Sequence, residues 1–172
     1  MNKTSALLLF VLLPLGAQEI KFPESFEKLA AKAKESLNVN LDGSMLQLAG
    51  NFLSSQNAGE AKAKELAGGL KGIAVRSFEF EKEGEYTDAD IAPIRAQLTA
   101  ARGWSNMVNI SEPGERVEVY TRKDGDRVVG MTVMVSEKRE LTVVYVDGAL
   151  DLARLRDLVG GKINLKVEAG KK

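Results

Sequence analysis

The sequence predicts an α+β fold in which helices pack on one face of an antiparallel β-sheet of about five or six strands. The main observation is the stretch 104–148, where four short runs rich in Val, Thr, Met and Tyr follow one another with turn-formers between them. Connections this short allow only antiparallel pairing, so this stretch is a predicted meander. A second observation is that the helical patterns lie before and after this stretch, with no long helix inside it.

The N-terminal part of the chain that follows a predicted leader over residues 1–17 is predicted to alternate helices with a short strand. Pro23 opens a helix, and the alternation of apolar and polar residues over 37–41 indicates a half-buried strand. Ser44 and Gln47 form a predicted capping box for a second helix, and a third, shorter helix runs over 57–66 until Gly68-Gly69 stops it. These two helices are alternatively one interrupted helix.

The next predicted strand, 73–80, changes the phase of its apolar positions between Val75 and Phe78. A bulge near Arg76-Ser77 or burial of both faces would reconcile the two phases.

A helix is then predicted over 87–101, with Thr87 or Asp90 as its cap. With Thr87 as the cap, Pro93 lies past the first turn and kinks the helix, whereas with Asp90 as the cap Pro93 fits. Gly103 ends this helix and leads into the meander.

The meander strands are predicted over 104–110, 117–122, 127–135 and 140–146, with a hairpin turn at Asp124-Gly125. The last two carry apolar residues at both alternate sets of positions, which indicates central strands. The sequence then predicts a last helix, which Asp151 caps and Gly160-Gly161 ends, and an edge strand near the C-terminus. The apolar residues of these two elements are Leu152, Leu155, Leu158 and Val159, then Ile163, Leu165 and Val167.

Residues 1–17 have the pattern of a secretory signal peptide, with Lys3 in the basic part and an apolar run of about ten residues behind it, too short to span a bilayer. Cleavage after Ala17 leaves residues 18–172 as a single α+β domain; an uncleaved N-terminal anchor is the alternative. Leu15 is large for its place before the cut, so the site can shift by about one residue. We expect an exported protein, periplasmic or secreted, with no transmembrane segment after cleavage.

The composition narrows the classes of function. Basic and acidic residues both number 24, so the chain has no excess of basic residues that would indicate nucleic-acid binding. The chain has neither Cys nor His, which removes disulfides, thiol nucleophiles, Ser-His-Asp triads, Cys/His zinc sites and His as a base or metal ligand. Any chemistry would rest on residues such as Asp, Glu, Lys, Tyr or Ser.

The short motifs all have simpler structural interpretations, so we assign no catalytic, cofactor or metal residue. The segment 38–43 resembles the start of an EF-hand loop but has Ala49 where the bidentate Glu belongs. The segment 68–72 lacks the spacing of a phosphate-binding loop. Alternate glutamates over 79–85 suit a solvated strand face or a basic partner, and Trp104 suits the core.

The segment 77–86, followed by Asp90-Ile91, the run 94–98 and Gly103-Trp104, resembles the bacterial domain of unknown function 4252 family. Segments 118–120, 140–144 and 148–155 continue that resemblance in order, so that it covers about 37–160. The resemblance implies an exported envelope protein with no assigned activity. Many relatives look like lipoproteins, whereas this leader has no Cys to carry a lipid.

Two hypotheses of function follow. The favoured one is a non-catalytic binding module that meets another envelope protein through a sheet face or an edge strand. The alternative is a hydrolase or lyase of the cell envelope that uses the carboxylates over 79–85 or Tyr86. Neither hypothesis includes a cofactor, and the sequence predicts no oligomeric state.

Overall fold

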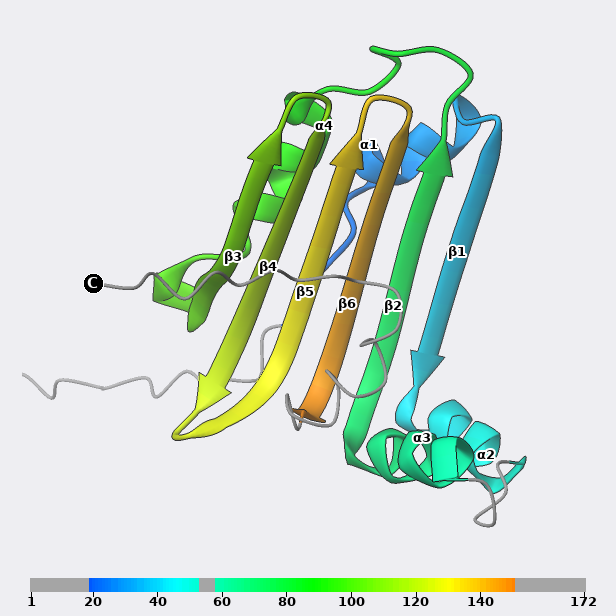
Figure 1. Ribbon diagram of the computed structural model, residues 1–172, viewed down its shortest axis with the longest axis vertical. Coiled ribbons are helices and arrows are strands. Elements are labelled where there is room, and N and C mark those ends of the chain that lie inside the picture. The colour runs from blue at the N-terminus through cyan, green and yellow to red at the C-terminus, as the bar shows by residue number, and fades with distance from the viewer. Residues whose placement is uncertain (1–18, 53–57, 151–172) are drawn as a thin grey trace, which may run out of the picture.

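A six-stranded sheet lies at the centre of the computed structural model, which describes residues 19–52 and 58–150 (Figure 1). The strand order is β1-β2-β6-β5-β4-β3, and every neighbouring pair is antiparallel. The predicted α+β class is therefore confirmed. The strands are β1 (Glu35–Asp42), β2 (Leu70–Glu79), β3 (Trp104–Glu112), β4 (Glu115–Asp124), β5 (Arg127–Glu137) and β6 (Glu140–Leu150).

The meander is confirmed in β3 to β6, and the last two strands are central, as their two-sided apolarity indicated. β6 pairs with β2 on its other side, so the hairpin-like pair β1 and β2 extends the same sheet. The predicted leader over 1–17, the C-terminal helix and the final edge strand lie outside the described residues.

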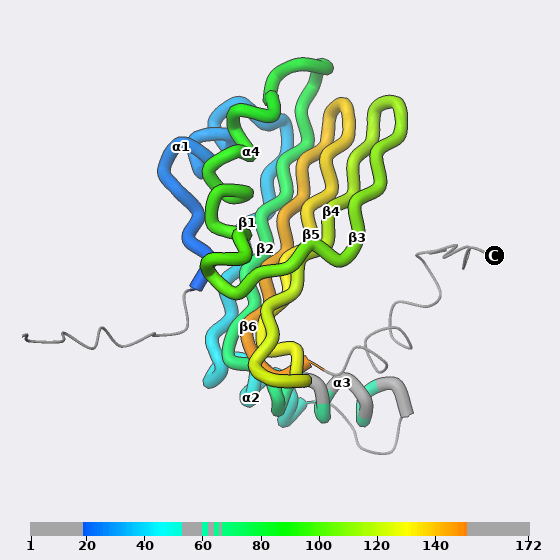
Figure 2. The backbone as a smooth tube through the Cα atoms, turned by 90° about the vertical axis from the view of Figure 1, so that its left-hand side faces the viewer, coloured from blue at the N-terminus to red at the C-terminus, as the bar shows by residue number. Residues whose placement is uncertain are grey.

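The helices α1 (Glu24–Glu27) and α4 (Asp88–Arg95) cover one face of the sheet, which we call the helix face (Figure 2). The short 3-10 helices η1 (Lys28–Ala31) and η2 (Ala100–Arg102) continue α1 and precede β3, while α2 (Gly43–Phe52) and α3 (Ala58–Gly69) lie at one end of the sheet. Burial of apolar side chains between the helices and this face forms the main core. It contains Ile20, Phe26, Leu29, Phe78, Phe80, Ile91, Ile94, Leu98, Trp104, Met134, Leu141, Val143 and Tyr145.

The phase change in β2 reflects burial on both faces. Pairing with β1 and β6 is regular from Ile73 to Glu79, so of the two alternatives the bulge near Arg76-Ser77 does not occur, and the register shift lies at Leu70 and Gly72. Phe78 points to the helix face, whereas Val75 lies on the opposite side. Arg76 shares the side of Phe78, where its guanidinium lies 4.4 Å from the ring centre of Phe22.

The helix before the meander is shorter than predicted. Thr87 caps α4 in a reciprocal pair with Asp90, so Pro93 lies inside the helix, and the helix ends at Arg95 rather than continuing to Ala101. A proline inside a helix removes one backbone hydrogen bond, which suits this early end. Gly103, with φ of 79°, then turns the chain into β3 as predicted.

The helices nearer the N-terminus also differ in detail. The first helix stops at Ala31, where η1 ends, and α2 is capped by Asp42 rather than by Ser44. The Asp42 carboxylate accepts hydrogen bonds from the Ser44 hydroxyl at 2.5 Å and the Met45 backbone N–H at 2.9 Å, and these bonds lower the pKa of Asp42. The helix predicted over 57–66 is confirmed as α3, which begins one residue later and ends three residues later.

Candidate functional site

Tyr86 fastens the loop after β2 to the hairpin between β5 and β6. Its hydroxyl donates to the backbone carbonyl oxygens of Glu137 and, at 2.9 Å, Glu140, and its ring stacks on Phe80 with centres 5.1 Å apart. Burial, with the nearby charges of Glu137 and Asp88, raises the pKa of Tyr86 to about 12. At neutral pH this phenol is therefore protonated and acts as a structural donor.

We expect Tyr86→Phe to lower the free energy of unfolding by about 1 kcal/mol, because the ring stacking stays and the hydrogen bonding is lost. The raised pKa adds a pH signature. The Tyr86 contribution is complete below pH 10, its unfolded-state pKa, and disappears as the pH rises to about 12. Urea unfolding of both proteins from pH 8 to pH 12 should show their stabilities converging. A difference that stays constant over this range would contradict the assignment.

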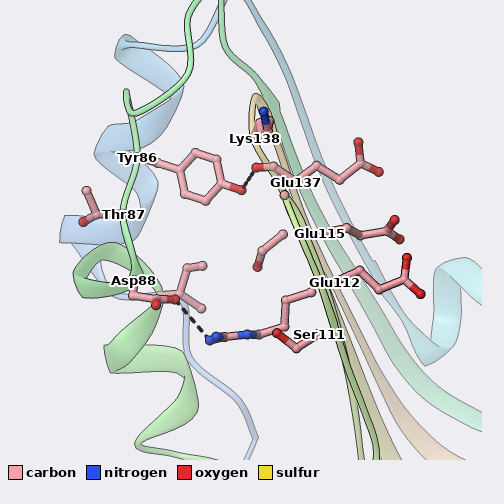
Figure 3. A pocket seen from close by; sticks show the side chains of 12 residues that line it. Tyr86, Thr87, Asp88, Ser111, Glu112, Glu115, Glu137 and Lys138 are labelled. Atoms are coloured by element: carbon pink, nitrogen blue, oxygen red, sulfur yellow. Dashed lines mark hydrogen bonds and ion pairs between the residues drawn. The ribbon is translucent and has the colours of Figure 1, made fainter.

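Two hollows lie at this end of the sheet. The first, of about 280 Å³, is lined by Tyr86, Asp88 and Arg116 among others, with Arg116 3.6 Å from the Asp88 carboxylate (Figure 3). Figure 3 shows that the carboxylates of Glu112, Glu115 and Glu137 point away from Tyr86, so Tyr86 and these acids are not brought together. The second, of about 420 Å³, is lined by exposed residues that include Glu79, Glu83, Glu115, Glu137 and Glu140.

The predicted run of glutamates over 79–85 lies mostly beyond the strand, because β2 ends at Glu79. Lys34 binds Glu79 at 3.3 Å and Lys138 binds Glu83 at 3.4 Å, while Glu85 accepts the backbone N–H of Lys82. These contacts hold the acids in separate local roles. The run therefore does not form a single constellation.

The other motifs singled out in the sequence have structural roles here. Trp104 is buried in the core, and Asn38 and Asn40 bond each other along β1. The glycine-rich segment 68–72 ends α3 and opens β2. Within residues 19–52 and 58–150, no three acidic side chains are grouped in a way that could hold a metal ion.

A buried ion pair that sequence reasoning missed joins α4 to β4. The Nε of Arg95 donates to the Glu118 carboxylate at 2.9 Å and 3.2 Å, and its Nη2 lies 2.7 Å from the same carboxylate as an ion pair. Tyr120 donates to this carboxylate at 3.1 Å, and Asp88 accepts a hydrogen bond from the outer side of Arg95. Burial alone would lower the pKa of Arg95, but the hydrogen bonds that it donates to Glu118 and Asp88 raise its pKa overall. This pair fixes α4 over the outer half of the sheet.

The outer strand β3 is a free edge, with no strand paired on its other side among the described residues. Met107 and Ile110 are 53% and 37% exposed, and the register shifts between Asn106 and Val108, so Met107 is the bulged residue. From Val108 onwards the strand pairs regularly with β4 as far as Glu112. It carries neither Lys nor Pro, two residues that commonly block further pairing at an edge.

The sheet face opposite the helix face, which we call the open face, is ordered in rows by the strand register. One row, the valine row, has a valine on every strand: Val39, Val75, Val144, Val133, Val119 and Val108. All six are only partly buried. Alternation within each strand was visible in the sequence, but the alignment of the valines depends on the register and could not be read from it.

A second row, the glutamate row, closes one end of the open face. The pairings Glu35 with Glu79, Glu79 with Glu140, Glu115 with Glu137, and Glu112 with Glu115 place acids side by side across the sheet. Like charges directly opposite each other destabilise a sheet unless cations lie nearby. Lys34 forms ion pairs with Glu35 and Glu79. Within the described residues, the other four acids of the row form no ion pair: Glu112, Glu115, Glu137 and Glu140.

No helix within the described residues has the length and apolar character needed to cross a bilayer. A family model for a domain of unknown function (DUF4252) matches residues 26–158. No curated protein and no solved structure matches the chain.

Proposed function

The chain belongs to the DUF4252 family of domains of unknown function, and we propose that it is an exported, non-catalytic binding module that takes an extended segment of another envelope protein at the β3 edge. The observation that carries this proposal is the free edge itself. Val108 to Glu112 offer regular strand geometry and an outer side that no strand among the described residues pairs with, beside the exposed side chains of Met107 and Ile110. Such an edge can accept one more strand by backbone hydrogen bonding.

The other edge of the sheet is less available. β1 carries a carboxylate at each end, Glu35 and Asp42, and α2 follows directly after Asp42. We therefore place the partner on β3. Charged residues and adjoining elements at a sheet edge restrict edge-to-edge pairing.

The chemistry of the edge specifies the partner segment. On the open face, Val108 and Ile110 would contact apolar side chains at alternate positions of an added strand. At the end of β3, Glu112 lies opposite Glu115, so a basic residue in the partner would be favoured there. The partner is therefore an extended segment with alternating apolar residues and a basic end.

In-cell photo-cross-linking from position 107 tests this proposal. A photoreactive residue in place of Met107 should give one adduct of discrete mass with another envelope protein. The cross-linked peptide should contain alternating apolar residues and a basic end. Adding Ile110→Lys should reduce the adduct by about tenfold or more, because it puts a charge on the edge. The matched control is Lys123→Ile, an exposed change near the opposite end of neighbouring β4, which should leave the adduct unchanged.

Three results would overturn the proposal. The first is no adduct above that from a probe at exposed Lys123, and the second is an adduct only with a second copy of this chain. The third is an adduct within the same chain, at residues 161–172, which would make the C-terminal tail the added strand. The same cells test export, because the recovered chain should begin at or near Gln18 and lie outside the cytoplasm.

The carboxylate-based alternative draws on one observation, the gathering of five glutamates around the larger hollow. All five are exposed to water, whereas a general acid at neutral pH usually depends on burial. The alternative predicts hydrolysis or elimination that Glu137→Gln with Glu140→Gln abolishes. Equal turnover of that variant and the unchanged chain on a panel of envelope glycans and esters would remove it.

A further inference from the structure

We propose that residues 151–172 of this chain fold back over the open face, placing apolar side chains on the valine row and the basic tail on the glutamate row. The occupant of the face is thus a segment of the same molecule. This inference is independent of the partner at the β3 edge. It makes the open face a second, internal part of the core.

The open face needs a cover on physical grounds. The valine row has a partly exposed valine on every strand, and Leu37 and Ile110 beside it are 52% and 37% exposed. Contiguous exposed apolar surface is uncommon on soluble proteins. Figure 2 shows α1 and α4 on the other side of the sheet, with α2 and α3 at one end. The described helices therefore leave the middle of the open face uncovered.

The chain leaves the sheet on this face. Leu150, the last described residue, clusters with Val128, Met131 and Val146, and this cluster is packed against Val133 and Val144 of the valine row. The segment that follows begins in contact with the surface it is proposed to cover. No long connection is needed, which keeps the entropic cost of docking small.

The segment has the matching pattern. Residues 151–159 read as an amphipathic helix whose Leu152, Leu155, Leu158 and Val159 share one side, with Ala153 and Asp157 on the other. Such a helix is about 14 Å long, enough to cross about three strand spacings. An unpaired apolar helix side and an unpaired apolar sheet face would then bury each other.

Charge complementarity sets the direction. Residues 151–172 contain six basic residues and three acidic ones, with Lys162, Lys166, Lys171 and Lys172 all in the tail. The glutamate row lies at the far end of β6 from Leu150, about 33 Å away at the rise of an extended strand. A helix over 151–159 followed by an extended tail spans more than this distance, so the lysines can reach Glu137 and Glu140.

Two full-length variants with matched charge test the docking. Leu155→Asp puts a carboxylate on the apolar side of the segment, and Ala153→Asp puts the same group on the polar side. We expect Leu155→Asp to increase the fluorescence of the apolar dye ANS several-fold and to speed trypsin cleavage within 151–172 by about tenfold, since cleavage follows the open population. Ala153→Asp should behave as the unchanged chain. Equal behaviour of the two variants would overturn the proposal.

A measurement without substitution covers the case in which Leu155→Asp fails to fold. In the unchanged chain, a soluble paramagnetic agent should broaden the methyl signals of Val75, Val133 and Val144 as little as those of Leu141 and Val143 on the helix face. Strong broadening of the first set would show an uncovered face and overturn the proposal. If the protection of these methyl groups disappeared when the protein was diluted, the proposal would also be overturned, because a second copy of the chain would then be what covers the open face.

The tail contact has its own test. Glu137→Gln with Glu140→Gln should speed trypsin cleavage after Lys162 and Lys166 several-fold, whereas Glu81→Gln with Glu85→Gln removes the same charge away from the row and should have no effect. An equal effect of both pairs would show that net charge alone matters, and would overturn this part of the proposal.

Discussion

Replacing Phe78 with alanine is expected to lower the free energy of unfolding by about 3 to 5 kcal/mol. The ring is 1% exposed and packs edge-on against Phe26 at 5.4 Å between ring centres, with Phe80 at 6.4 Å. Phe78 therefore joins β2 to α1. Its loss removes apolar burial and leaves a cavity at the junction of sheet and helix.

Phe52→Ala is the matched control, because it removes the same side chain from a position that is 89% exposed. We expect a change within about 0.5 kcal/mol for this variant. Urea unfolding followed by far-ultraviolet circular dichroism measures both. If the two variants lost similar stability, the helix face would not be the main core.

Glu118→Ala is expected to cost about 3 kcal/mol, because it leaves the charge of Arg95 partly buried without its main partner. This loss of stability lies at the lower end of the range for breaking a buried ion pair, because Arg95 keeps its ion pair with Asp88 at 3.1 Å and its side chain is 23% exposed. Tyr120 also loses its acceptor. The loss of stability should be greatest where α4 packs on β4.

The exposed Glu115 on the same strand supplies the control, and Glu115→Ala should change stability by less than about 0.5 kcal/mol. The double variant Arg95→Met with Glu118→Leu should be more stable than Glu118→Ala, because it removes both charges together. A double variant that is less stable than Glu118→Ala would show that the ion pair itself, rather than the cost of an unpaired charge, dominates.

The sequence predicted the elements of the sheet well because local signals determine them. Asp124-Gly125 and Gly103 mark turns through backbone conformations that glycine favours, and each meander strand carries β-branched residues. The pairing of β6 with β2 was not predictable in the same way. It joins segments about 65 residues apart, and only the packing of both strands into one core selects it.

The candidate surfaces were predictable only in part. The run of glutamates was visible as a pattern, but the free edge at β3 follows from the strand order, and the valine row and the glutamate row exist only once the register of all six strands is known. The pair of Arg95 and Glu118 likewise depends on how α4 crosses β4. Tyr86 was a candidate for chemistry in the sequence, and its hydrogen bonding to two carbonyl oxygens gives it a structural role.

The central claim, that β3 receives a strand from another protein, is tested most directly by amide hydrogen exchange. The purified chain is compared alone and with a synthetic peptide that copies the segment cross-linked to position 107. We predict slower exchange for amides within Val108 to Glu112 and unchanged exchange along β1. Unchanged exchange along β3, or equal slowing at both edges of the sheet, would contradict it.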